Sequence, residues 1–176
     1  GSMRGLAWLA RVGPSPLDPW RYAMGWSEVA ARHHARRLER AGWLERCPMT
    51  WGQGSLFLAT RTGVTVLGLP LIASRTPAPT WWAHDSGCAW IAAWLTVRGW
   101  NFLGQRELLN DPEWSGQIDW LDRHNFKRSG HRPDLVVVHP QGRVALEVEL
   151  AAKSRPRLTA ILSLHLAWLV SRKTSS

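Results

Sequence analysis

Asp134, Glu147, Glu149 and Lys153 are the residues whose types and spacing could do chemistry together. Two neighbouring carboxylates repel each other unless a proton or a cation lies between them, and carboxylate oxygens are ligands that Mg²⁺ prefers. Glu149 could accept a proton from an attacking water, and Lys153 could stabilise charge on a phosphoryl oxygen. The pattern therefore indicates metal-assisted phosphoryl chemistry. The alternative is an edge hairpin whose acids face solvent, and spacing by itself favours that alternative.

A β-hairpin is expected to position these acids. β-branched runs at 131–138 and 143–150 flank a Pro/Gly turn at 139–142. If Val138 pairs with Arg143, Asp134 lies directly opposite Glu147, with Cβ atoms roughly 4.5–5.5 Å apart. Alternation along the second strand sends the Glu147 and Glu149 side chains the same way. A one-residue bulge would destroy this pairing.

The charge distribution points to a polyanionic partner. The chain of 176 residues has a net charge of +9, and its first 75 residues hold ten Arg against four acidic residues. A basic surface of this kind is typical of proteins that bind phosphate backbones, although a solvated basic face has the same composition. The apolar content of 45% with 20% charged residues excludes a disordered chain.

The first half predicts short helices followed by a β-ribbon. Helices are expected over 3–11 and 18–24, and a longer one runs from a Ser27 cap to about Ala41. Strands at 43–46 and 56–59 flank a Gly-containing turn, and Thr60 opens a last helix that ends near Gly68. Val29 and Leu38 of the longer helix are expected to face the core.

This order predicts a winged helix-turn-helix, in which a basic third helix enters the DNA major groove and the hairpin contacts nearby phosphates. A winged helix that binds a protein instead is the alternative. The expected DNA-binding residues lie on the basic helix, at the wing tip and at the start of the last helix: Arg32, His33, Arg36, Arg37, Arg40, Trp51 and Arg61.

The second half is expected to form a separate domain. A Pro-containing linker at 73–80 divides a domain over 3–72 from one over 81–176. Apolar residues along all of 82–98 predict a well-buried helix, and we interpret His84 in its first turn as a hydrogen-bonded structural residue. Glu107 is expected near a strand, and 110–129 cannot be assigned.

The acidic motif resembles that of the PD-(D/E)XK nuclease superfamily, in Pro133-Asp134 followed by Glu147-Val148-Glu149 with Lys153 nearby. That resemblance implies that Asp134 and Glu147 hold Mg²⁺ or Mn²⁺ for phosphodiester hydrolysis, and that Glu107 supplies a further acid. More narrowly, the chain resembles the replication-relaxation proteins of bacterial plasmids and mobile elements. The supporting motifs are Leu38-Glu39-Arg40-Ala41-Gly42, Ala59-Thr60-Arg61-Thr62-Gly63, Arg106-Glu107-Leu108 and Arg132-Pro133-Asp134.

The implied fold is α+β: a winged helix-turn-helix followed by a PD-(D/E)XK, restriction-endonuclease-like α/β domain. Two departures matter. Glu149 stands where the family has Lys, so that Lys153 must replace it or activity is reduced or absent. The family also adds a strand after a helix expected over 157–171, which leads us to expect truncation at the C-terminus, with a partner or a missing segment completing the sheet.

The resulting hypothesis is a DNA-binding protein of a plasmid or mobile element with a metal-dependent endonuclease or nickase domain, acting in replication, relaxation or transfer. The alternative is a catalytically inactive accessory factor that uses the nuclease-like fold for dimerisation or backbone contact. A tyrosine relaxase is disfavoured, because the single Tyr, Tyr22, lies far from the acids in sequence. Double-stranded DNA, and a second copy in a homodimer, are the expected partners.

A cytoplasmic location without membrane insertion is the remaining expectation. Cys47 and Cys88 match no metal or disulfide spacing, which indicates a reducing compartment. No apolar run reaches the length of a membrane span.

Overall fold

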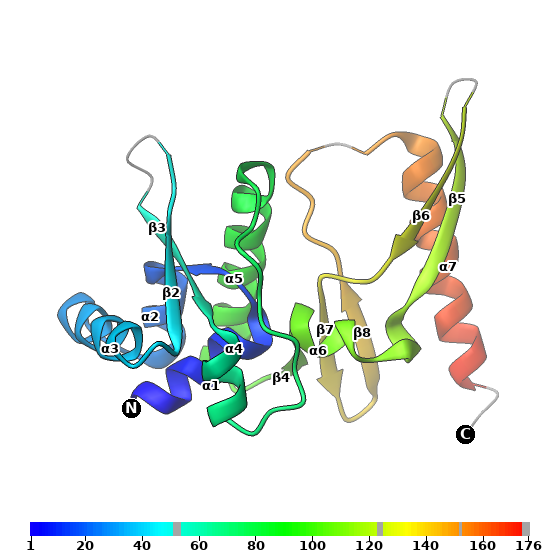
Figure 1. Ribbon diagram of the computed structural model, residues 1–176. Helices are drawn as coiled ribbons and strands as arrows, with labels where there is room; N and C mark the ends of the chain where they lie inside the picture. The colour runs from blue at the N-terminus through cyan, green and yellow to red at the C-terminus, as the bar shows by residue number, and fades with distance from the viewer. Residues whose placement is uncertain (51–53, 123–124, 152, 174–176) are drawn as a thin grey trace.

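The computed structural model describes residues 1–50, 54–122, 125–151 and 153–173, and Figure 1 shows their arrangement. In this described part the protein is a mixed α+β structure of seven α-helices and three small antiparallel sheets. The helices are α1 (Ser2–Val12), α2 (Leu17–Met24), α3 (Glu28–Arg40), α4 (Arg61–Val66), α5 (Trp82–Val97), α6 (Gln105–Leu109) and α7 (Arg155–Lys173). The strands are β1 (Ser15–Pro16), β2 (Leu44–Pro48), β3 (Ser55–Ala59), β4 (Asn101–Leu103), β5 (Gly116–Asp122), β6 (Asn125–His131), β7 (Leu135–His139) and β8 (Gly142–Leu146).

The first half contains the predicted helices and hairpin. Strands β2 and β3 pair antiparallel, and the two residues of β1 add a third strand in the order β1-β3-β2. The Ser27 hydroxyl caps α3 by accepting a hydrogen bond from the Ala30 backbone N–H at 3.2 Å, as predicted. Gly42 follows α3 with a φ of 71°, a left-handed conformation that favours glycine.

One side of α3 packs on the core, but the predicted set of core residues was partly wrong. Ala31, Ala35 and Leu38 are buried, whereas Val29 is 79% exposed. Val29 lies in the first turn of α3, where it turns to solvent on the side of the helix away from Leu38. Small alanines take its place against the other helices.

A single hydrophobic core runs through both halves of the chain. Leu6 and Trp20 from the first half belong to the same buried cluster as Ala92 and Leu135 from the second half. Helix α2 packs against α5, which stands in the middle of the molecule in Figure 1. Residues 69–78 contain neither helix nor strand, as a linker requires, yet the segments on either side of them share this core.

Helix α5 has two different faces. Ala89, Ala92 and Ala93 are fully buried, as the sequence predicted for the whole helix. Trp90 and Trp94 are instead 47% and 44% exposed, so that the prediction of a helix buried all round was wrong. The small alanines allow close packing of α2, and Trp90 lies at the edge of that contact, with its ring centroid 6.0 Å from that of Tyr22 on α2.

The second sheet has the order β4-β7-β8 and carries the predicted hairpin. Val138 pairs with Arg143 and Leu135 with Leu146, which is the register expected from the sequence. The paired ladder ends at Leu146, however, so that Glu147 and Glu149 follow β8 instead of lying within a strand.

The unassigned segment forms a third sheet, the β5–β6 hairpin, which lies along α7 in Figure 1. A Cβ atom at Gly116 would lie only 2.6 Å from the Leu164 side chain, so glycine permits this close approach of β5 to α7. Among the described residues, none of the helices is both long and apolar enough to cross a bilayer.

Candidate catalytic cavity and DNA-binding face

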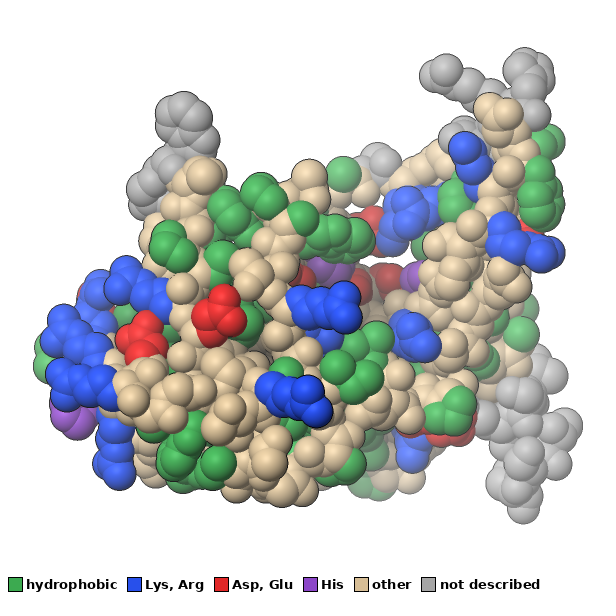
Figure 2. Space-filling model, in the orientation of Figure 1, with side chains coloured by type: hydrophobic (Ala, Val, Ile, Leu, Met, Phe, Trp, Pro, Cys, Tyr) green, Lys and Arg blue, Asp and Glu red, His purple; other side chains and the backbone are tan. Residues whose placement is uncertain are grey.

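The four residues of the acidic motif line one cavity. It has a volume of about 850 Å³ and lies between α5, the end of β6, the segment after β8 and the start of α7. Figure 2 shows a hollow at this place, with acidic and histidine side chains inside it and basic side chains beside it. The charged and imidazole side chains that line the cavity are His84, His131, Arg132, Asp134, Glu147, Glu149, Lys153 and Arg157.

Asp134 lies where the β7–β8 ladder ends. Its backbone N–H donates to the Leu146 carbonyl at 3.0 Å, and its Oδ2 accepts a hydrogen bond from the Val148 N–H at 2.7 Å. The Asp134 carboxylate thus makes one more hydrogen bond between the two chain segments beyond Leu146, where the backbone ladder of β7 and β8 ends. Its other oxygen, Oδ1, lies 3.2 Å from Nε2 of His84 on α5.

His84 is held as a cation by its surroundings. Hydrogen bonding to Asp134, and then to Asp85 and Cys88, raises the pKa of His84 from its ordinary value to about 12. The imidazole is therefore protonated at neutral pH and forms an ion pair with Asp134. Burial raises the pKa of the Cys88 thiol, which also accepts a hydrogen bond from the Gln105 amide at 3.3 Å. This matches the hydrogen-bonded role expected for His84, and adds that the ring borders the cavity.

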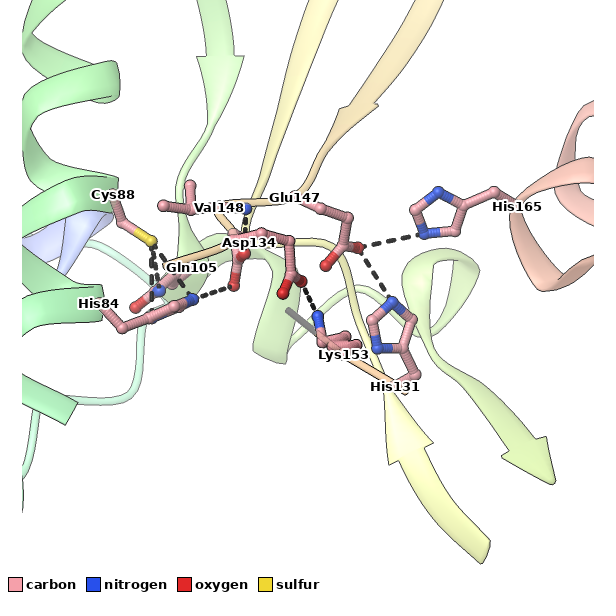
Figure 3. Close-up of polar contacts among 10 residues, drawn as sticks. His84, Cys88, Gln105, His131, Asp134, Glu147, Val148, Lys153 and His165 are labelled. Carbon is pink, nitrogen blue, oxygen red and sulfur yellow. Dashed lines mark hydrogen bonds and ion pairs between the residues drawn. The ribbon is translucent and has the colours of Figure 1, made fainter. Parts of the chain in front are cut away.

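The Glu147 carboxylate faces two other histidines. Its Oε1 lies 2.9 Å from Nε2 of His131, at the end of β6, and 3.2 Å from Nε2 of His165, on α7. Figure 3 shows the Asp134 and Glu147 carboxylates pointing to opposite ends of this group of residues. The two acids therefore line the same cavity without facing each other as the hairpin register predicted.

Glu149 and Lys153 form an ion pair, four residues apart, in the segment that leads to α7. The Lys153 side chain is 19% exposed and that of Glu149 is 37% exposed. Both groups border the cavity, and Figure 3 shows Lys153 between Asp134 and Glu147. The pair places one cation and one carboxylate at the border of the cavity.

Glu107 is placed elsewhere. It lies in the short helix α6 directly after β4, and its Oε2 accepts a hydrogen bond from the Gly104 N–H at 2.8 Å. Its Oε1 accepts from Arg11 Nε at 2.9 Å, which ties α1 to α6. Glu107 is not among the residues that line the cavity. The structure thus brings Asp134, Glu147, Glu149 and Lys153 together without Glu107.

The two histidines that contact Glu147, His131 and His165, are not among the site residues predicted from the sequence. His131 precedes Asp134 by three residues, but this spacing belongs to no motif. His165 comes from the middle of α7, and nothing in the sequence relates it to the hairpin until the packing of α7 on β5 is known. For His84, the sequence offered one signal. Its spacing of four residues from Cys88 indicates that these two side chains share a face of α5.

The expected DNA-binding residues of α3 share one exposed face. All five are exposed, opposite the buried Ala31, Ala35 and Leu38: Arg32, His33, Arg36, Arg37 and Arg40. Figure 2 shows a group of basic side chains over this helix. Arg32 forms an ion pair with Glu28 one turn earlier, at 2.6 Å.

The remaining two candidates are Arg61 and Trp51. Arg61 is exposed at the start of α4, where the Thr60 side chain caps the helix by accepting from the Gly63 N–H. Trp51 lies outside the described residues.

No family model, no curated protein and no solved structure matches this chain. The resemblance to the nuclease superfamily and to replication-relaxation proteins therefore stays a prediction.

Proposed function

We propose that this protein binds duplex DNA through a winged helix-turn-helix in its first half and hydrolyses phosphodiester bonds in the cavity. One observation carries the proposal: Asp134, Glu147, Glu149 and Lys153 line a single cavity. Arg132 and Arg157 line it too and would attract a phosphate backbone. On this proposal the second half is a diverged PD-(D/E)XK-like domain, as in proteins that act on plasmid or mobile-element DNA.

The DNA-binding half is supported by the arrangement of α3 and the β1-β3-β2 sheet. Helix α3 presents a continuous basic face, and the β2–β3 hairpin stands beside it in Figure 1. A helix of this kind fits the major groove, and an adjacent hairpin reaches the flanking phosphates.

The proposed reaction uses groups of the chain itself. The Lys153 ammonium and the His84 imidazolium would hold the non-bridging oxygens of the scissile phosphate. Glu149 would accept a proton from a water molecule as the oxygen of that water attacks phosphorus. The bond from phosphorus to the leaving oxygen then breaks, and the leaving oxygen takes up a proton from solvent or from His84.

The Mg²⁺ or Mn²⁺ ion predicted from the sequence requires oxygen ligands. An all-oxygen site shared by Asp134 and Glu147 does not fit the side chains as they lie. Oδ1 of Asp134 faces His84 and Oε1 of Glu147 faces two imidazoles. No step above is therefore routed through a cation held between these two acids.

The test is cleavage of supercoiled plasmid by the full chain. We expect nicked or linear product on gel electrophoresis, and parallel reactions with Mg²⁺, Mn²⁺ or excess chelator measure whether a cation contributes. A complete lack of product with every divalent cation, for protein that still binds DNA, would contradict the enzymatic part of the proposal.

A second candidate function is a DNA-binding accessory factor without catalysis. It is favoured by the fact that each cavity acid already has a basic partner: Asp134 has His84, Glu149 has Lys153, and Glu147 has two histidines. Acids paired in this way can hold the elements together without taking part in a reaction. The plasmid assay separates the two functions, since the accessory factor binds but leaves the DNA intact.

Changing Arg36 and Arg37 together to Ala is expected to weaken duplex binding on every sequence. If each side chain contacts one phosphate, the slope of log affinity against log salt should fall in magnitude by about 2. Fluorescence anisotropy with labelled duplex over a salt series measures this slope.

The matched control removes two exposed arginines from other elements, Arg98→Ala with Arg128→Ala. It lowers the net charge by the same amount. Equal losses of affinity in the two double variants would show that the overall charge, and not α3, binds the DNA.

A further inference from the structure

We propose that His131, Glu147 and His165 form a binding site for a divalent transition-metal ion of the Zn²⁺ or Co²⁺ type. The ligand atoms of these three residues lie within 4.8 Å of one another, although they come from β6, the segment after β8 and α7. This site differs in composition from the all-oxygen site expected from the sequence. It does not rest on the proposed hydrolysis, because an ion can bind here without any reaction.

The three side chains converge on one point. Both imidazoles direct Nε2 at the same carboxylate oxygen, Oε1 of Glu147, at 2.9 and 3.2 Å. The side chains are largely withdrawn from solvent, with exposed fractions of 11% for His131, 17% for His165 and 20% for Glu147. A small ion placed among them would be held by two nitrogens and one oxygen, and the cavity would leave room for water or a phosphate oxygen beside it.

A buried nitrogen supports this assignment. Nε2 of His165 is buried and, among the described residues, makes no hydrogen bond, although it lies close to Glu147. An ion pair without a hydrogen bond satisfies this buried nitrogen only in part, and an unsatisfied buried polar group costs about 1–3 kcal/mol. A metal ion bound to Nε2 would remove that cost.

The surroundings fix the His165 ring in place. It stacks on Trp168 with ring centroids 5.0 Å apart, and Trp168 in turn packs edge-on against the buried Trp114 at 5.6 Å. Ligands whose orientation is set beforehand by neighbouring groups bind a metal more tightly than free ones do.

The donor types select the kind of metal. Imidazole nitrogen suits Zn²⁺, Co²⁺ and related ions, whereas Mg²⁺ and Ca²⁺ prefer oxygen. Two histidines and one glutamate with an open position are a ligand set found in catalytic zinc sites. The site therefore favours Zn²⁺ or Co²⁺ over Mg²⁺.

The test measures binding of Co²⁺ and Zn²⁺ to the metal-free full chain without DNA. We expect one ion per chain by isothermal titration calorimetry and a visible absorption band when Co²⁺ binds. His131→Ala and His165→Ala should each weaken binding by more than the roughly 10–100-fold that changes around a metal site typically cause. His131→Gln and His165→Gln repeat the test with side chains that still fill the site.

Two controls identify the site. His139→Ala removes an exposed histidine at the end of β7, and His84→Ala removes a histidine from the other group of ligand-type residues, His84, Cys88 and Asp134. Both should leave the affinity within about three-fold, well below the loss of a ligand. Loss of binding in His84→Ala but not in His131→Ala or His165→Ala would overturn the assignment, as would a wild-type chain that binds neither ion.

The two proposals fail separately. Co²⁺ binding without plasmid cleavage would contradict only the proposed hydrolysis. Plasmid cleavage with Mg²⁺ by a chain that does not bind Co²⁺ or Zn²⁺ would contradict only the metal site inferred here.

Discussion

Replacing Asp134 with Asn is expected to reduce plasmid cleavage by about 10²–10³-fold, the range for loss of one group that stabilises charge on the reacting oxygens. Asn has nearly the same shape, and its oxygen can still accept the hydrogen bond from the Val148 N–H. The fold should therefore persist, and only the negative charge is lost. That charge is the main reason why His84 is protonated.

The pH dependence gives this prediction a second readout. In the wild type the pKa of His84 is raised to about 12, so that the imidazolium persists throughout the neutral range. In Asp134→Asn the pKa should fall toward its ordinary value of about 6.5. If the imidazolium holds the phosphate, the residual activity of the variant should rise as the pH is lowered through that value, whereas the wild type should show no such rise.

A matched control is Asp119→Asn, which removes an exposed carboxylate of β5 that pairs with Arg128. It should cleave like the wild type. Asp134→Asn that melts at the wild-type temperature and cleaves at the wild-type rate would remove Asp134 from the proposed reaction.

Replacing Trp20 with Ala is expected to destabilise the whole chain by about 3–5 kcal/mol, as measured for large aromatic side chains in cores. Trp20 is completely buried, and its indole N–H donates to the Gly5 carbonyl at 3.0 Å. It also packs against Trp26 and Phe57, which joins α2 to the first sheet. Urea unfolding followed by circular dichroism measures the change.

The form of the unfolding curve tests how the two halves depend on each other. Because α2 packs on α5 within one core, we expect a single transition for the wild type and a lower midpoint for the variant. Trp90→Ala is the control, since Trp90 is 47% exposed and should lose about 1 kcal/mol or less. Two separate transitions, with Trp20→Ala shifting only one, would support the division at residues 73–80.

Local signals predicted most of the helices and the two hairpins around Gly-containing turns. The caps at Ser27 and Thr60 depend on a single side-chain hydrogen bond to a nearby N–H, so the sequence contains all that is needed. The β7–β8 register is likewise fixed by the short turn between His139 and Gly142.

Segments whose structure depends on distant partners could not be predicted. The β5–β6 hairpin lacks a regular apolar alternation, since Leu121 and Phe126 are exposed, and it is held against α7 by packing that no local pattern reveals. Glu107 was misplaced for a similar reason: its contact with Arg11 joins α6 to α1 across the chain.

The acids of the candidate site were predictable, but their partners were not. Asp134, Glu147 and Glu149 lie near one turn, so a hairpin is enough to bring them close. The direction of each carboxylate depends on His84, His131 and His165, which arrive from α5, β6 and α7. The prediction that Asp134 lies opposite Glu147 was wrong because the β7–β8 ladder ends one pair earlier. Histidine side chains also pair with each carboxylate, in place of the shared cation that was expected.

The common core of the two halves has a geometric consequence. Helices α2 and α5 pack directly together, so α3 and His84 lie on parts of the chain that share one core. A duplex gripped by α3 would then meet the cavity at a constant spacing along its axis. If the proposed cleavage occurs, strand breaks would fall at a fixed number of base pairs from the segment bound by α3. A flexible linker between the DNA-binding part and the cleaving part would instead give breaks at variable distances.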